Sequence, residues 1–229
     1  MNWMNFNMDI IDKLAEIFKE FPGIGERQAR RFVYFLMSRT PAYSDNLSSL
    51  ISELKKEIAQ CKECFRFFVL LGGSVAKERP NRQVCEICTD GNIDSSILMV
   101  VEKDSDLESV KKSRTYHGKY FILGGLVPIV EKNTKSRVRI EELKEKISAQ
   151  GGPASGGKDN NSKNLKEVIL AFSLNPQGEH TDAYVREQLG EIIKSLGIKI
   201  SSLGRGLSTG TELEYSDNDT LRNALKNRQ

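Results

Sequence analysis

The four cysteines of this chain form two pairs, Cys61–Cys64 and Cys85–Cys88, with two residues inside each pair and twenty between the pairs. A two-residue gap allows both sulfurs of a pair to turn toward one point, so two pairs can surround a metal ion as a tetrahedron. Four thiolate ligands leave no open coordination position, which is typical of a structural zinc site. We therefore predict that Cys61, Cys64, Cys85 and Cys88 bind zinc and that the ion stabilises the fold.

Two disulfide bonds, or reduced cysteines in a core, are the alternatives to a zinc site. Disulfides form in oxidising compartments. The first residues carry Asp9, Asp12 and Glu16 and lack a basic leader followed by an unbroken apolar block. This start is not typical of a signal peptide. We therefore expect a cytoplasmic protein with reduced cysteines, which favours zinc.

The segment Pro22-Gly23-Ile24-Gly25 has the form of a helix-hairpin-helix turn. Gly23 and Gly25 allow a tight turn and leave backbone N–H groups exposed at the start of the next helix, where they suit a phosphate oxygen. That helix is basic and has no acidic residue between its first and last arginines. We predict a sequence-independent contact with a nucleic-acid backbone; an ordinary helix turn with solvated arginines is the alternative. The arginines are Arg27, Arg30, Arg31 and Arg39.

A further group of candidate residues is acidic and follows apolar runs. Glu102 comes directly after Ile97–Val101, Asp104 follows closely, and Glu179 comes after Val168–Phe172. A continuous apolar run is typical of a strand that is buried on both faces, and open α/β sheets bind ligands at the carboxyl ends of their strands. We predict that these acids lie at that edge and bind a basic partner or a metal ion. Solvated acids at the ends of loops are the alternative.

Hydrophobic periodicity places these residues on helices and strands. A helix that Asp9 caps precedes the glycine turn, and helices are predicted over 26–38, 45–60, 105–113, 140–147 and 180–196. After Asn92 the helices alternate with apolar runs, which implies a mostly parallel sheet with crossover helices. The predicted strands cover 97–101, 120–123, 168–172 and 198–200.

These elements predict an α+β chain built from several modules. Residues 1–60 form a helical hairpin module, 61–92 a four-cysteine module, 93–200 an α/β domain, and 201–229 a C-terminal segment. The Gly/Ser/Asn-rich stretch 148–163 predicts a flexible surface insertion. The net charge of +3 is too small to indicate a partner, and the apolar runs are too short to span a membrane.

In this order, the features resemble the RecR family of bacterial recombination mediators. FPGIGERQARRFVYFL resembles the helix-hairpin-helix of the family, the cysteine pairs resemble its zinc finger, and VVEKDSDL with KYFILGG resembles the opening of its Toprim domain. LGRGLSTGTELEYSDNDTLRNALKNR resembles its Walker-B-like C-terminal segment. Three stretches depart from the family pattern: the loop 65–84 is longer, the insertion 148–163 is not typical, and residues 130–137 lack a typical loop. Any role of the loop 130–137 in partner contacts stays open.

Active members of the Toprim fold use a strand-end glutamate with an Asp-x-Asp pair that holds magnesium. The corresponding stretch of this chain, Phe172–Glu179, contains Ser173 and Asn175 but no such pair. Magnesium prefers carboxylate oxygens, so phosphodiester chemistry is disfavoured. A magnesium-dependent Toprim nuclease or topoisomerase-like enzyme that uses Glu102, Glu179 and Asp182 stays as the alternative.

The resemblance implies a DNA-repair protein that is not an enzyme. It implies a ring, commonly a tetramer, that encircles single- or double-stranded DNA and acts with RecO and RecF to load recombinase on single strands. By position, Arg27 and Arg31 match basic hairpin residues implicated in DNA contact. Glu102 and its neighbours fall in the region implicated in RecO contact. An assembly scaffold with negligible DNA affinity is a further alternative.

Overall fold

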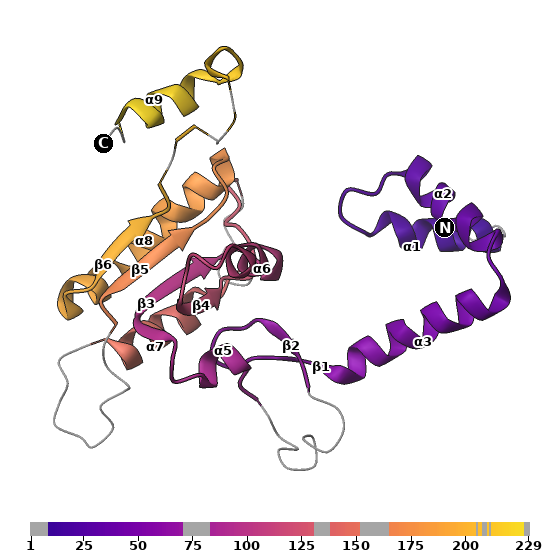
Figure 1. Cartoon of the computed structure of the whole chain (residues 1–229), viewed down its shortest axis with the longest axis horizontal. Coiled ribbons are helices and arrows are strands. Elements are labelled where there is room, and N and C mark those ends of the chain that lie inside the picture. The colour runs from indigo at the N-terminus through magenta and orange to yellow at the C-terminus, as the bar shows by residue number, and fades with distance from the viewer. Residues whose placement is uncertain are drawn as a thin grey trace, which may run out of the picture. The chain divides into compact units, whose positions relative to one another are not determined.

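The computed structural model describes residues 9–70, 83–130, 138–151, 165–204, 206–207, 210 and 212–226. The chain divides into two compact units, Met1–Ile58 and Ala59–Gln229 (Figure 1). We call them the hairpin unit and the sheet unit and describe each by itself. The expected boundaries at residues 92 and 200 both fall inside the sheet unit.

The hairpin unit is helical, with α1 (Ile10–Lys19), α2 (Glu26–Met37) and α3 (Pro41–Glu57). The carboxylate of Asp9 caps α1 by accepting a hydrogen bond of 2.8 Å from the Asp12 N–H, as predicted. Helices α1 and α2 pack through a small core of Ala15, Ala29 and Val33. The third helix begins earlier than expected because Pro41 suits the first helical position, and it ends at Glu57 because Ile58 is extended.

The sheet unit is built on four parallel strands in the order β4-β3-β5-β6. Their bounds lie within three residues of the predicted ones. Val101 at the end of β3 pairs with Ile122 of β4 and with Ala171 of β5, so these three strands end at one edge. The strands are β3 (Asp94–Val101), β4 (Gly118–Ile122), β5 (Glu167–Ala171) and β6 (Lys199–Ser202).

One face of the sheet is covered by α7 (Ile140–Gln150) and α8 (Pro176–Leu196). Alternate side chains of the strands, such as Leu98 and Val100, enter this core because side chains alternate along a strand. The first three residues of the expected insertion 148–163 belong to α7, and residues 152–163 lie outside the described residues. Most of the departing loop 130–137 also lies outside them.

The other face of the sheet packs against α6 (Asp104–Ser113) and the cysteine region. This region contains β1 (Ile58–Gln60), β2 (Phe67–Val69) and α5 (Glu86–Thr89). The chain ends with the 3-10 helix η2 (Leu213–Tyr215) and α9 (Asn218–Lys226). In the part of the chain that the structure describes, no helix has the length and apolar character needed to cross a membrane.

Candidate metal centre and nucleic-acid interface

The four cysteine sulfurs converge at one point of the sheet unit. The Sγ atoms of Cys61, Cys64, Cys85 and Cys88 all lie within 4.8 Å of one another, and the four residues are free thiols. The Cys64 and Cys85 sulfurs are 3.5 Å apart and the Cys61 and Cys88 sulfurs 3.9 Å apart. A tetrahedron with metal–sulfur distances of about 2.3 Å has edges of about 3.8 Å. The cluster therefore fits a tetrahedral metal ion, and the disulfide alternative is not what the structure contains.

Hydrogen bonds inside the cluster set how easily its thiols lose their protons. Contacts with the other three thiols hold the pKa of Cys61 far below its usual range, and the Cys85 N–H also donates to the Cys61 sulfur at 3.3 Å. Cys61 raises the pKa of Cys85, but Cys64 and Cys88 outweigh it and lower that pKa to about 6. The same contacts, that with Cys61 first, raise the pKa of Cys64 and of Cys88. The four thiols thus share their protons, and a metal cation would favour the thiolate form of all four.

The first cysteine pair is fixed to the sheet through its backbone. The Cys64 carbonyl accepts a hydrogen bond of 2.9 Å from the N–H of Ile122 on β4. The turn closes with a 3.0 Å bond from the Phe65 N–H to the Cys61 carbonyl, and Phe65 takes a φ of 62°. Because a positive φ is costly for a bulky residue, the packing around Phe65 must hold it there. This packing includes the ring of Phe121 on β4, with centroids 5.4 Å apart.

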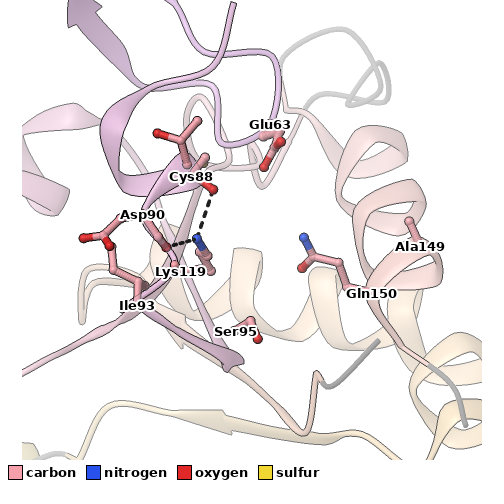
Figure 2. Close-up of a pocket in the computed structure, with 10 residues that line it drawn as sticks. Glu63, Cys88, Asp90, Ile93, Ser95, Lys119, Ala149 and Gln150 are labelled. Carbon is pink, nitrogen blue, oxygen red and sulfur yellow. Dashed lines mark hydrogen bonds between the residues drawn. The ribbon is translucent and has the colours of Figure 1, made fainter. Parts of the chain in front are cut away.

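The second cysteine pair is fixed by the ammonium group of Lys119 on β4. Its Nζ donates to the carbonyls of Ile87, Cys88 and Asp90 at 3.0, 3.1 and 3.3 Å. Figure 2 shows this lysine beneath Cys88 and Asp90, in a pocket that Glu63 and Gln150 also line. A cation suits the carbonyl end of a helix, so Lys119 holds the end of α5 against the sheet.

Arg66 joins the cysteine region to α6. Its side chain is only 8% exposed and bonds Glu86 of α5 at 2.5 Å and Glu108 of α6 at 3.0 Å. Burial acts to lower the pKa of Arg66, but the bond to Glu86 and the charges of Glu86, Cys85 and Glu108 outweigh it, so the pKa is raised. The buried Nε has no hydrogen-bond partner in the described part of the chain. Arg66 therefore forms internal ion pairs that join α5 and α6.

Sequence reasoning placed the four cysteines together but missed Lys119 and Arg66. Arg66 is close to Cys64 in sequence and adds to the positive charge of Cys61–Cys88, which gives no sign that the side chain is buried. Lys119 directly precedes the apolar run 120–123, and no sequence pattern connects it with α5. Only the tertiary structure brings these cations to the cysteine pairs.

The glycine turn of the hairpin unit has the backbone that the sequence predicts. Gly23 has a φ of +79°, a left-handed conformation that side chains rarely adopt. Gly25 is the N-cap of α2 and forms no side-chain capping bond, so the first N–H groups of this basic helix receive no capping side chain. This arrangement suits a phosphate oxygen.

The hairpin arginines differ in their partners. Arg27 and Arg31 are exposed, and neither forms an ion pair within the described part of the chain; Arg31 donates a hydrogen bond of 3.3 Å to the side-chain amide oxygen of Gln28. Arg30 bonds Asp12 of α1 at 2.8 Å and lies 3.8 Å from Glu26. Arg27 and Arg31 thus keep their charge available to a ligand, whereas Arg30 holds α1 and α2 together.

The predicted acids lie around the carboxyl edge of the sheet but differ in their surroundings. Glu102 follows β3, is 20% exposed and lies 3.8 Å from Lys103. Asp104 accepts a hydrogen bond of 2.8 Å from the N–H of Phe67, so it joins the cysteine region to α6. Glu179 is exposed in the first turn of α8, which follows β5. The Asp104 carboxylate thus has an internal role in the fold.

Asp182, one of the three acids of the magnesium alternative, makes internal contacts, and so does Asn175. Asp182 pairs with Arg186 at 2.5 Å and accepts from Ser202 at 2.6 Å, and the Asn175 side chain caps α8 by accepting from the Gly178 N–H at 2.8 Å. In the described ranges, the four cysteines are the one group of at least three His, Cys, Asp or Glu residues placed to hold a metal ion. These contacts give Asp182 and Asn175 internal roles in α8 and at its start.

Comparisons with known proteins match nearly the whole chain. A family model described as Toprim domain matches residues 96–203, and one described as RecR, C-terminal matches residues 206–229. The chain is 32% identical to Recombination protein RecR of Acidothermus cellulolyticus, over 96% of this chain and 94% of that protein. It is 31% identical to the Bacteroides thetaiotaomicron protein of the same name, over 96% and 93%. It is 32% identical to that of Dehalococcoides mccartyi, over the same shares.

Proposed function

Because this chain belongs to the RecR family of recombination proteins, we propose that it binds DNA through its hairpin unit and acts in recombinational repair without catalysing a reaction. The observation that carries this proposal is the pair Arg27 and Arg31. They lie one helical turn apart, beside a glycine turn, with no carboxylate partner among the described residues. Such arginines replace condensed counterions on the phosphate backbone, so binding is independent of base sequence and weakens with salt.

The cysteine cluster has a structural role in this proposal. Cys61, Cys64, Cys85 and Cys88 would hold zinc, which supplies a cross-link between the two pairs and no open coordination position when bound. Because the cluster packs in the same core as β3 and β4, it stabilises the sheet that carries the acidic edge. The DNA contact is assigned to Gly23, Gly25, Arg27 and Arg31, with a smaller share for Arg30.

The partners and assembly follow the family. We assign to this chain a cytoplasmic homo-oligomeric ring, a tetramer, that acts with RecO and RecF to load recombinase on single-stranded DNA. Glu102 and Glu179 are the residues assigned to a basic partner, since both lie around the carboxyl edge of the sheet and Glu179 is exposed. Asp104 contributes by holding this edge in place through its bond to Phe67.

The double variant Arg27→Ala/Arg31→Ala tests the DNA contact. Its affinity for a labelled oligonucleotide should fall at least about tenfold at moderate salt, because two phosphate contacts are lost. Lys112→Ala/Lys194→Ala is the control, since it removes the same charge from exposed positions of the sheet unit. Equal affinities of the two double variants, both folded by circular dichroism, would remove the hairpin from the proposal.

The enzyme alternative rests on Glu102 at the end of β3 and makes a different prediction. Plasmid DNA incubated with the protein and magnesium would be nicked, and Glu102→Gln would abolish the nicking. We expect the plasmid to stay supercoiled with either protein. Nicking that depends on Glu102 would establish the enzyme alternative and overturn the non-catalytic proposal.

A further inference from the structure

The exposed face of α2 continues past its arginines into aromatic side chains. Tyr34 and Phe35 follow Arg27 and Arg31 at the spacing of successive helical turns, so all four lie on one face. Tyr34 is 54% exposed and Phe35 42% exposed. The opposite face of α2 carries the buried Ala29 and Val33. Two large rings therefore lie on the solvent side of the helix, next to the arginines.

Phe35 belongs to a cluster that presents flat groups to solvent. The guanidinium carbon of Arg39 lies 4.2 Å from the Phe35 ring centroid and 5.9 Å from that of Tyr43. The Phe35 and Tyr43 rings meet edge to face, with centroids 6.1 Å apart, and Tyr43 is 43% exposed. A guanidinium stacked on a ring is held flat. This cluster therefore offers π-faces and a positive charge from side chains already in contact.

Flat rings interspersed with arginines match the chemistry of single-stranded nucleic acid. Unpaired bases stack on aromatic rings and guanidinium planes, while the phosphates require a positive groove. In a duplex the faces of the bases are already stacked and cannot reach the rings. The sequence from Arg27 to Ser44 contains no acidic residue, so the charge of the whole aromatic surface is complementary to a phosphate backbone.

We propose that Tyr34 and the Phe35–Arg39–Tyr43 cluster form a base-stacking surface for single-stranded DNA whose phosphates contact Arg27 and Arg31. The proposal rests on the proposed function and deepens it, because it gives the hairpin unit a preference for single strands over duplex. Arg31 and Tyr34 are three residues apart on α2, about 4.5 Å along the helix axis. One strand can therefore contact both with adjacent phosphate and base groups.

A second copy of this chain is the competing occupant of the aromatic surface. In a symmetric contact each copy presents the same patch to the other, so Arg27, Arg31 and Arg39 of both copies would meet. Glu26 is the one acidic residue of α2, so this helix offers no other carboxylate to neutralise these arginines. Like charges brought together in this way disfavour the contact, whereas a polyanion relieves them.

Tyr34→Leu tests the stacking contact, with Tyr34→Phe as the matched control. Leucine keeps the apolar volume and the helix but removes the π-face, whereas phenylalanine keeps the ring. Binding would be measured by fluorescence anisotropy with three ligands of equal length: an oligothymidylate, an abasic strand and a duplex. We expect Tyr34→Leu to weaken binding of oligothymidylate about fivefold or more. Tyr34→Phe should bind it normally, and neither variant should change binding of the other ligands.

The outcomes separate this inference from the proposed function. If Arg27→Ala/Arg31→Ala binds all three ligands as well as the unaltered chain, the proposed function fails. If that double variant is weakened but Tyr34→Leu binds oligothymidylate normally, or loses affinity equally for all three ligands, only the stacking proposal fails. Light scattering after size exclusion supplies the remaining outcome: a smaller assembly with Tyr34→Leu than with Tyr34→Phe would make the surface an interface between copies and overturn the proposal.

Discussion

The hairpin unit and the sheet unit use the same residue types for opposite purposes. Arg27 and Arg31 of the hairpin unit are exposed and lack a carboxylate partner in the described chain. In the sheet unit, Arg66 is buried between Glu86 and Glu108, and Lys119 is saturated by three carbonyl groups. The charges of Arg27 and Arg31 are available to a ligand, whereas those of Arg66 and Lys119 hold the fold together. Surroundings, more than residue type, separate a binding residue from a structural one.

The glycines of the two units show the same contrast. Gly23 needs its left-handed φ of +79° to turn the chain, and nothing lies within 4 Å of the position of its absent Cβ. Gly178 in the sheet unit has no such φ, but a Cβ there would overlap the carbonyl oxygen of Ser173. The hairpin glycine thus leaves open space around the turn, whereas the sheet glycine allows a close internal packing.

The largest effect should come from Cys61→Ser, which removes one thiolate from the cluster. Because structural zinc binding contributes about 10–16 kcal/mol in small domains, we expect an insoluble or strongly destabilised sheet unit that binds little zinc. Elemental analysis and thermal unfolding would measure this, and chelator treatment of the unaltered chain should reproduce it. Less than about half a zinc per unaltered chain, purified without chelator, would contradict the structural role of the metal.

Gly178→Ala should destabilise the sheet unit by about 3 kcal/mol, because its methyl group overlaps the Ser173 carbonyl and the backbone must move. Gly190→Ala on the same helix is the matched control. It meets nothing within 4 Å and should raise stability by about 0.5–1 kcal/mol through helix propensity. Denaturant unfolding of the two variants gives both values. A stability of Gly178→Ala equal to that of the unaltered chain would show that this edge tolerates rearrangement.

Arg66→Gln should cost about 2 kcal/mol of the free energy of unfolding. Removal of one partner from a fully buried ion pair costs about 3–5 kcal/mol, but Glu86 and Glu108 are 53% and 44% exposed and can be hydrated. Lys62→Gln removes an exposed charge beside the same cysteine pair and should have almost no effect. If both variants unfold alike, then Arg66 does not join the cysteine region to α6.

The smallest effect is expected for Arg30→Ala. This variant tests whether the role of Arg30 differs from that of the other hairpin arginines. The Arg30–Asp12 pair is partly exposed, so its loss should lower stability only slightly. Since the charge of Arg30 is shared with Asp12, the loss of DNA affinity should be well below that of Arg27→Ala. Titrations of the two single variants at one salt concentration would compare them. A larger loss with Arg30→Ala would reverse the assignment.

Local patterns in the sequence were sufficient to predict the fold class, the parallel sheet and the cysteine cluster. The apolar runs that became β3, β4, β5 and β6 are short and continuous, and the two-residue cysteine spacing leaves few geometries. Helix ends were less accurate because single residues decide them. Pro41 starts α3 before the expected position, and the helical pattern of α7 continues through Gln150 into a stretch rich in small residues.

Contacts between residues distant in sequence could not be predicted. The bonds that dock the cysteine region, from Arg66 to Glu108 and from Phe67 to Asp104, span 42 and 37 residues. The position of Asp104 after a buried strand predicted a partner contact, and the basic helix predicted a DNA contact for Arg30. The structure gives both side chains an internal contact as well. The DNA, metal-binding and partner roles of the individual site residues stay predictions until they are measured.

The most direct test of the DNA-binding proposal is the affinity of the unaltered chain for a labelled single strand across a salt series, with and without magnesium. The same samples would be run on a denaturing gel. We expect the logarithm of the binding constant to fall linearly with the logarithm of the salt concentration, and the DNA to stay intact in every sample. Binding that is absent or insensitive to salt would contradict a phosphate contact by Arg27 and Arg31, and cleaved DNA would contradict the non-catalytic role.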